Sequence, residues 1–369
     1  MKTKNSYQNL NTVGILWLAL SGFYITGITK YSPVYISFFL AIIYTTYLFF
    51  QRKKVYWPFL LFIFITLLFI PAIYNSTVST SINLLISFYS PVLCAVLFYK
   101  KKISPSILLA IFLSYAILLS SDGIWRLFNP DLTHVEQLSK LGVLFQIYKS
   151  NSFMYIDSNY VGLESIIIIS SFIYLFKDYR LVGKIKILYI IVILLLILSC
   201  ALTFSRAAIL SLLFLFLVYF IFKLNMKYIF AILPICIVSL SGLIYYKFST
   251  DISFGSKFYI IEITYDFIVN SWDSHLLFGV GIGNTVNYLG IGAHNLAITY
   301  LIETGIVGFS AFIFSMLFFL FSLKRDFFIV IIPFLLTSMS LGTTAIPYFF
   351  TFSCLCVLKK LDLFKIEFK

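Results

Sequence analysis

The run ILYIIVILLLILSCALTF, residues 187–204, decides the class of this protein. Nearly all of its side chains are apolar. At 1.5 Å of rise per residue, a helix of this length approaches the roughly 30 Å thickness of a hydrocarbon core. Comparable runs, among them ILWLALSGFYITGIT at 15–29 and VYISFFLAIIYTTYLFF at 34–50, recur along the chain. We therefore expect lipid to surround most of the protein.

Composition supports the same class. Of 369 residues, 61% are hydrophobic and 11% charged, which exceeds the apolar share of a water-soluble core. The sequence therefore predicts an all-α, polytopic membrane helix bundle with about twelve crossings, in which residues 1–369 form one integral membrane domain. The expected helices are 13–29, 34–50, 56–74, 80–99, 104–120, 160–176, 187–203, 207–222, 228–246, 298–323, 327–343 and 345–358.

The cysteines all lie inside apolar runs, where a thiol behaves as a small hydrophobic group. We expect neither disulfides nor a metal site from them. They are Cys94, Cys200, Cys236, Cys354 and Cys356.

The formal charge of +13 is unevenly distributed. With both termini in the cytoplasm, 20 of the 27 Lys and Arg fall on the cytoplasmic side, as the positive-inside rule requires. The basic charge therefore reflects topology, and we expect no nucleic-acid partner. The other seven are Lys30, Arg126, Lys140, Lys149, Arg206, Lys247 and Lys257.

Two of the expected outer connections are long, residues 121–159 and 247–297, and we expect them to be periplasmic loops that carry the chemistry. They contain all three histidines, His134, His275 and His294.

The stretch 253–308 is polar and glycine-rich before it enters an apolar helix. Gly279, Gly281 and Gly283 let the backbone bend and approach a ligand. His294 directly precedes the helix, where an imidazole is either catalytic or held by a carbonyl or lipid headgroup. The GVGIG run alone lacks the context of a dinucleotide fingerprint or an ion filter.

Two further motifs lie at expected helix ends. In TFSRAAIL, residues 203–210, Arg206 is a charge near hydrocarbon, which makes it either a functional group or an anchor that snorkels to the interface. In MYIDSNYVG, residues 154–162, Asp157 and Asn159 precede a helix, where an aspartate also serves as an N-cap or Asx turn.

Together these motifs resemble the superfamily of O-antigen ligases and Wzy-type O-antigen polymerases, whose members extend lipid-linked bacterial surface polysaccharides. The resemblance rests on Asp-x-Asn at 157–159, Ser-Arg at 205–206, Gly-x-Gly-x-Gly-Asn at 279–284, His-Asn at 294–295 and Glu-x-Gly-x-x-Gly at 303–308. The motifs span about 154–308. One departure is Lys257, where the family commonly has an arginine; lysine supplies charge but not the planar fork.

The resemblance implies a glycan donor on undecaprenyl diphosphate. His294 would be the base for the attacking hydroxyl, and Arg206 would stabilise the departing diphosphate. No Asp-x-Asp pair occurs in the outer segments, so a metal-independent reaction without a cofactor is expected. The implied substrate-binding residues are Lys257, Arg126, Asp157, Asn159, Asn295 and Glu303.

Three functions stay open at this point: a polymerase of repeat units, an O-antigen ligase that transfers the glycan to lipid A core, and a transporter of lipid-linked oligosaccharides. A transporter would line a central cavity with polar groups, whereas this chain concentrates them in two outer segments. The compact loops favour the polymerase. Expected partners are membrane lipids, a chain-length regulator and a flippase, and the expected location is the bacterial inner (plasma) membrane.

Overall fold

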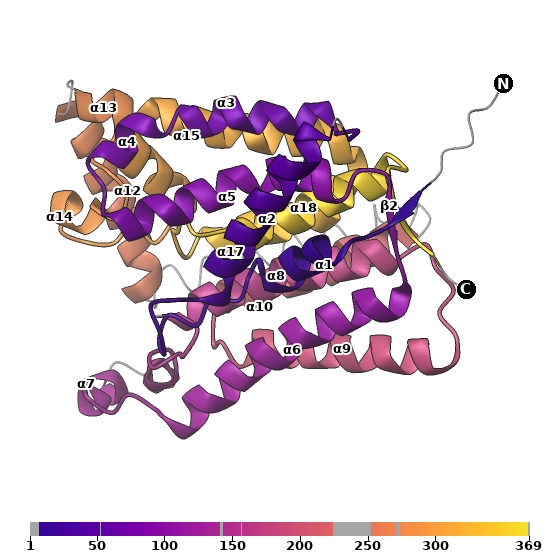
Figure 1. Ribbon diagram of the computed structural model, residues 1–369. Helices are drawn as coiled ribbons and strands as arrows, with labels where there is room; N and C mark the ends of the chain where they lie inside the picture. The colour runs from indigo at the N-terminus through magenta and orange to yellow at the C-terminus, as the bar shows by residue number, and fades with distance from the viewer. Residues whose placement is uncertain are drawn as a thin grey trace.

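The computed structural model describes residues 7–51, 53–140, 143–155, 157–223, 252–270 and 274–367. Within these ranges the protein is a helix bundle with one small sheet at one end (Figure 1), which confirms the all-α prediction. The helix expected at 228–246 lies outside the described residues. The α-helices are α1 (Thr12–Leu20), α2 (Pro33–Phe50), α3 (Leu61–Leu67), α4 (Ile70–Tyr74), α5 (Val78–Leu97), α6 (Pro105–Phe128), α7 (Val135–Lys140), α8 (Ser158–Phe176), α9 (Gly183–Ala201), α10 (Arg206–Lys223), α12 (Ile252–Asn270), α13 (Ser274–Phe278), α14 (Thr285–Leu289), α15 (Leu296–Leu323), α16 (Phe327–Val330), α17 (Ile332–Ser338) and α18 (Pro347–Lys360). The short 3-10 helices are η1 (Trp57–Leu60), η2 (Leu144–Tyr148) and η3 (Lys324–Asp326), and the strands are β1 (Gln8–Asn9), β2 (Lys101–Ile103) and β3 (Phe364–Ile366).

Six described helices are long and apolar enough to cross a membrane: Pro33–Phe50, Val78–Leu97, Pro105–Phe128, Ser158–Phe176, Gly183–Ala201 and Leu296–Val330. Two shorter apolar helices, Trp57–Leu67 and Arg206–Phe222, accompany them. The structure thus supports a membrane protein with several spanning helices, and the count of about twelve stays a prediction.

Prolines divide two of the expected helices. The segment 56–74 forms η1, α3 and α4, with Pro58 and Pro71 in the first turns of η1 and α4. The segment 327–343 forms α16 and α17, with Pro333 in the first turn of α17. Proline lacks the N–H that would continue the hydrogen-bond ladder, so each helix restarts there.

The first helix ends at Leu20, earlier than the expected residue 29. The backbone N–H groups of Thr26 and Gly27 instead donate to the carbonyls of Met154 and Phe153, at 3.1 and 3.0 Å. The chain after α1 therefore pairs with a distant segment, and this tertiary contact overrides the local helical tendency.

Both long connections contain helix. Helix α6 continues to Phe128 and takes in the first part of the segment 121–159, because Arg126 pairs with Asp122 one turn earlier and neither charge interrupts the helix. Helix α12 occupies much of the segment 247–297.

The interior of the bundle is built around α5, α8 and α18. Helix α18 packs against both α5 and α8, and every residue from Pro347 to Leu358 is buried. Aromatic rings fill the contacts, as where Phe350 meets Phe88 and Phe62 at centroid distances of 4.7 and 5.9 Å. Helix α9, by contrast, exposes Ile190, Leu194 and Leu198, as a lipid-facing helix would.

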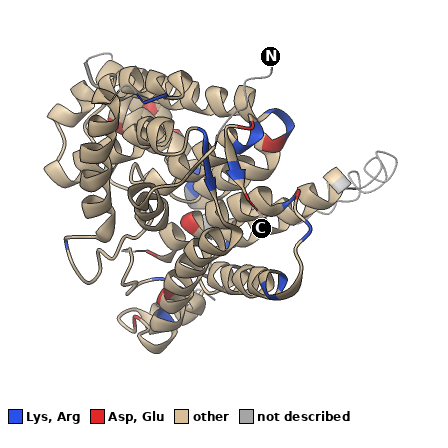
Figure 2. Cartoon of the chain, turned by 45° about the vertical axis from the view of Figure 1, so that its right-hand side comes forward, with Lys and Arg blue, Asp and Glu red and all other residues tan. Residues whose placement is uncertain are grey.

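The predicted cytoplasmic segments meet at one end of the bundle, here called the basic end. The parallel strands β1, β2 and β3 join residues 8–9, 101–103 and 364–366 in that order. Asp326 accepts from Lys177 and Lys360, each at 2.6 Å, and Asp178 pairs with Lys359 at 2.9 Å. Figure 2 shows most Lys and Arg around the side that holds the two chain termini. The segregation of basic residues along the sequence is therefore also a segregation in space.

Candidate active site

The opposite end of the bundle holds the functional candidates. Figure 1 shows α7, α13 and α14 at this end, away from β2 and the C-terminus. Connecting residues of several helices lie here, among them the described residues of 129–155 and the segments 202–205, 290–295 and 339–346.

Arg206 is the first residue of α10, and its side chain is exposed. The turn before it is tied down. The Ser205 carbonyl accepts from the N–H of Ile209 at 3.0 Å, and the N–H of Ser205 donates to Thr203 Oγ1 at 3.1 Å. The Ser158 hydroxyl, at the start of α8, donates to the Thr203 carbonyl at 2.7 Å. Two of the sequence motifs thereby become neighbours.

Lys149 lies beside Arg206, although the sequence reasoning did not single it out. Nζ of Lys149 is 5.6 Å from the ring centre of Phe145, and Cζ of Arg206 is 5.3 Å from the same ring centre. The two charges are therefore at most about 11 Å apart, the sum of those distances. Lys149 is one of the seven basic residues expected outside the cytoplasm and lies four residues after an aromatic, which is the signal that could have pointed to it.

Lys257 joins them from α12. It is half-buried, and its Nζ lies 3.4 Å from Oγ of Ser340, in the connection between α17 and α18. Burial lowers the pKa of Lys257, and the positive charge of Arg206 lowers it further. We call Lys149, Arg206 and Lys257 the cationic cluster.

The positive charges of the cationic cluster act on one another. Burial lowers the pKa of Lys149; the carboxylate of Asp157 opposes this shift, and the charges of Arg206, Lys257 and Arg126 add to it. Both lysines therefore hold their protons less tightly than free lysine does. A multivalent anion would relieve the repulsion and accept charge-assisted hydrogen bonds.

Asp157 caps helix α8. Its Oδ1 accepts from the backbone N–H of Asn159 at 2.8 Å, and its Oδ2 accepts from the side-chain amide of Asn159 at 3.3 Å. The N-cap interpretation of this aspartate is thus confirmed. Its charge also acts on Lys149, so the cap lies at the edge of the cationic cluster.

His294 is exposed and immediately precedes α15. Its φ is 44°, in the left-handed region that non-glycine residues seldom adopt. Asn295 is the N-cap of α15, and its Oδ1 accepts from the backbone N–H groups of Ala297 at 2.9 Å and Ile298 at 3.4 Å. The cap thereby fixes the start of the helix next to the imidazole.

The α17–α18 connection links this helix start to the cationic cluster. A Cβ at Gly342 would lie 1.7 Å from Thr299 Oγ1 and 3.0 Å from the Asn295 carbonyl, so the connection runs directly against α15. Ser340 of the same connection contacts Lys257. His294 and the cationic cluster thus border one short segment, whose role the sequence reasoning missed.

Glu303 is buried, with 6% of its surface exposed. Its Oε1 accepts from the Thr285 hydroxyl at 2.8 Å, and the backbone N–H groups of Gly283 and Thr285 also hydrogen-bond to the carboxylate. Helix α15 is kinked at Gly305, where φ is 64°. The Glu303 side chain thus holds the glycine-rich segment against the kinked helix.

The glycines of this segment approach the protein's own backbone. We expected them to let the chain approach a ligand, yet a Cβ at Gly279 would lie 2.2 Å from the Glu303 carbonyl oxygen, and one at Gly281 would lie 2.5 Å from the Asn75 carbonyl oxygen. Their φ values of 80° and 93° also favour glycine. The N–H of Gly281 donates to the Glu303 carbonyl at 3.1 Å. The segment therefore packs between the kink of α15 and the α4–α5 turn.

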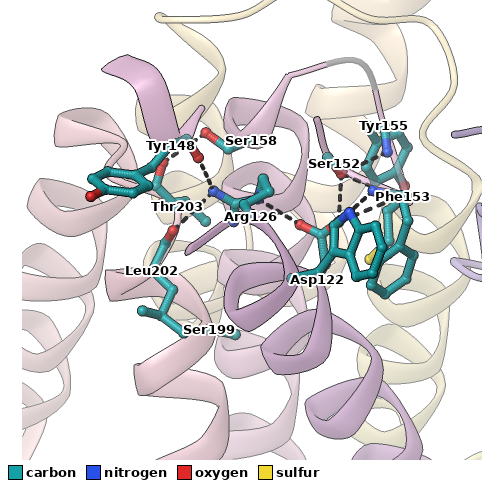
Figure 3. Close-up of polar contacts among 12 residues, drawn as sticks. Asp122, Arg126, Tyr148, Ser152, Phe153, Tyr155, Ser158, Ser199, Leu202 and Thr203 are labelled. Atoms are coloured by element: carbon teal, nitrogen blue, oxygen red, sulfur yellow. Dashed lines mark hydrogen bonds and ion pairs between the residues drawn. The ribbon is translucent and has the colours of Figure 1, made fainter. Parts of the chain in front are cut away.

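Arg126 is fully buried and occupied by the protein (Figure 3). Its Nε donates to Asp122 Oδ2 at 2.9 Å, and its Nη1 donates to the carbonyls of Tyr148 at 2.7 Å and Leu202 at 3.0 Å. Its Nη2 is buried without a hydrogen-bond partner among the described residues, and no part of the side chain is exposed.

The other histidines lie apart from the cationic cluster. His134 is exposed next to α7, and the His275 ring contacts Tyr288 at a centroid distance of 5.6 Å. Within the described ranges, no three His, Cys, Asp or Glu side chains form a metal-binding group. Metal independence stays a prediction.

The apolar helices and the polar end define a multispanning membrane protein with a cationic site. A protein-family model described as O-antigen ligase, Wzy_C, matches residues 190–313, which include Arg206, Lys257 and His294. This match confirms the resemblance to the Wzy and O-antigen ligase superfamily and implies a glycosyl-transferring enzyme. No curated protein matches the chain.

Proposed function

We propose that this protein is a polymerase of O-antigen or capsule repeat units carried on undecaprenyl diphosphate. It transfers a lipid-linked glycan to a sugar hydroxyl of a second lipid-linked repeat unit, without a metal ion, at the periplasmic face. The observation that carries the proposal is the cationic cluster. Two half-buried lysines and an arginine within electrostatic reach of one another match the charge of a diphosphate leaving group.

The reaction needs one proton transfer and one departing anion. The acceptor hydroxyl oxygen attacks the anomeric carbon of the donor and forms the new glycosidic C–O bond. The bond from that carbon to the diphosphate oxygen breaks, and its electron pair leaves with undecaprenyl diphosphate. His294 takes the hydroxyl proton, since its imidazole is exposed at the start of α15 and a neutral ring nitrogen can accept a proton. The cationic cluster stabilises the diphosphate as its negative charge grows.

The amphiphilic donor suits a site at a helix end. The polyprenyl tail stays in lipid beside the apolar helices while the diphosphate meets the connecting segments. Tyr148 and Phe145 of the 129–157 connection border the cationic cluster and offer rings for sugar stacking. A chain-length regulator and a flippase are the proposed partners, and the inner membrane with cytoplasmic termini is the proposed location.

A ligase of the same superfamily is the second candidate, because the matching family model carries that description. It would use the same cluster and base with lipid A core as acceptor. The acceptor, not the donor chemistry, separates the two functions.

A deletion strain analysed by gel electrophoresis of its surface polysaccharide tests the choice. Loss of the polymerase leaves single repeat units on the lipid core. Polymer that accumulates on undecaprenyl diphosphate instead would identify a ligase. Extension of purified lipid-linked repeat units in proteoliposomes, without translocation of the lipid, separates either enzyme from a transporter.

A further inference from the structure

The two segments that carry Lys149 and Arg206 are joined through a buried ion pair. Nη1 of Arg126 donates to the Tyr148 carbonyl, which directly precedes Lys149, and to the Leu202 carbonyl, in the turn that leads to Arg206. One nitrogen thus bridges the η2 segment and the α9–α10 turn. Figure 3 shows the guanidinium between these carbonyls on one side and Asp122 on the other.

Further hydrogen bonds close this link into a ring. The Lys149 carbonyl accepts from the N–H of Ser158 at 2.9 Å, and the Ser158 hydroxyl donates to the Thr203 carbonyl at 2.7 Å. The rings of Tyr148 and Phe204 stack at 5.4 Å. Tyr148 is next to Lys149, and Leu202, Thr203 and Phe204 lie within four residues of Arg206, so a shift of one segment moves the other.

Asp122 fixes the same assembly from its other side. Its Oδ1 accepts from the Ser152 hydroxyl at 2.6 Å and from the N–H of Phe153 at 3.0 Å, while its Oδ2 holds Arg126. Both charged side chains are completely buried. Replacing a buried ion pair by apolar residues is often neutral or stabilising, so stability alone is a weak reason for this arrangement.

We propose that the Asp122–Arg126 pair is a positioning device that sets the separation between Lys149 and Arg206, and thereby the fit of the cationic cluster to a diphosphate. The inference rests on the proposed function of the cluster. Asp122 was absent from the site residues expected from sequence, and Arg126 acts through the backbone and not through contact with substrate.

The substitution Arg126→Lys, made in the full chain and reconstituted in lipid nanodiscs, tests whether Arg126 positions the two segments or only pairs with Asp122. Lysine retains the charge opposite Asp122 but lacks the fork that reaches the ion-pair partner and two carbonyls together. We expect a modest fall in the unfolding temperature, because buried carbonyls lose their donor. The dissociation constant for undecaprenyl diphosphate should rise roughly tenfold, because misplacement of binding groups by about 1 Å is costly. The distance distribution between spin labels at positions 146 and 207 should broaden.

Lys177→Arg is the matched control, because Lys177 pairs with Asp326 at the basic end, at 2.6 Å. It should change neither readout. If Arg126→Lys folds poorly, the double variant Asp122→Asn with Arg126→Gln takes its place. It removes both charges without leaving one unpaired in the interior, and it should show the same weaker binding and broader label distribution.

Unchanged affinity and an unchanged label distribution in both variants would overturn the inference. Weaker binding with a wild-type label distribution would also overturn it, since Arg126 would then affect binding without setting the separation between the two segments. If the proposed function is wrong, Lys149→Ala and Arg206→Ala will bind undecaprenyl diphosphate with wild-type affinity. In that case the label distances alone still test whether Arg126 sets the separation between the two segments.

Discussion

Replacing Lys149 by Ala should weaken diphosphate binding and stabilise the unliganded protein. The substitution removes one charge of the cationic cluster but leaves the carbonyl that accepts from Ser158 in place. A hydrogen bond between charged groups contributes about 1.5–3 kcal/mol. Loss of this contact corresponds to roughly ten- to a hundredfold weaker binding. Relief of the repulsion from Arg206, at most about 11 Å away and screened by solvent, stabilises the unliganded protein by on the order of 1 kcal/mol.

The assay pairs two measurements on purified protein in nanodiscs. Titration with undecaprenyl diphosphate gives the dissociation constant, and thermal unfolding without ligand gives the stability. Lys140→Ala is the matched control, because Lys140 is an exposed lysine of α7 in the same expected outer segment. It should alter neither value. A destabilised Lys149→Ala protein that binds with wild-type affinity would refute the reasoning, since Lys149 would then serve packing and not anion binding.

The remaining predictions concern charge, base, backbone and topology. Diphosphate binding should weaken as pH rises through the lowered pKa values of Lys149 and Lys257. Over the same range, up to about pH 10.5, the free energy of unfolding without ligand should increase, because unfolded lysines still hold the protons that the folded ones have lost. A pH-independent affinity up to about pH 10 would contradict this. His294→Ala should lower single-turnover transfer roughly 10²–10⁴-fold, whereas a His294→Gln variant that keeps most of the rate would make His294 a positioning group. Gly281→Ala should lower the free energy of unfolding by about 1–3 kcal/mol more than Gly290→Ala does. Both glycines have positive φ, but only the substitution at Gly281 would place a Cβ within 2.5 Å of a carbonyl oxygen. Equal losses would show that the backbone shifts to accommodate the new Cβ. Cysteine labels at positions 53, 101 and 184 should resist outer-face reagents while labels near 140 and 285 react, and the reverse pattern would invert the proposed topology.

Much of the candidate site was visible in the sequence because it lies at helix ends. Asp157 and Asn295 precede apolar runs and form caps, as short polar residues do at helix starts. Arg206 and His294 were found in the same way, at the boundary between apolar and polar sequence. Lys149 and Asp122 lie away from any such boundary motif, and the contacts that give them meaning join residues far apart in the chain.

The sequence by itself determined that this is a helical membrane protein with its basic residues gathered toward one end, because hydropathy and charge act on each segment independently of its neighbours. Tertiary structure alone decided which cations meet and what the glycines serve. Arg126, which the charge pattern placed with Arg206 outside the cytoplasm, is buried against Asp122, whereas Lys149 and Arg206 both lie near the ring of Phe145. Gly281 packs against the Asn75 carbonyl. Such pairings depend on how distant helices pack, and no local pattern encodes which partner a side chain will meet.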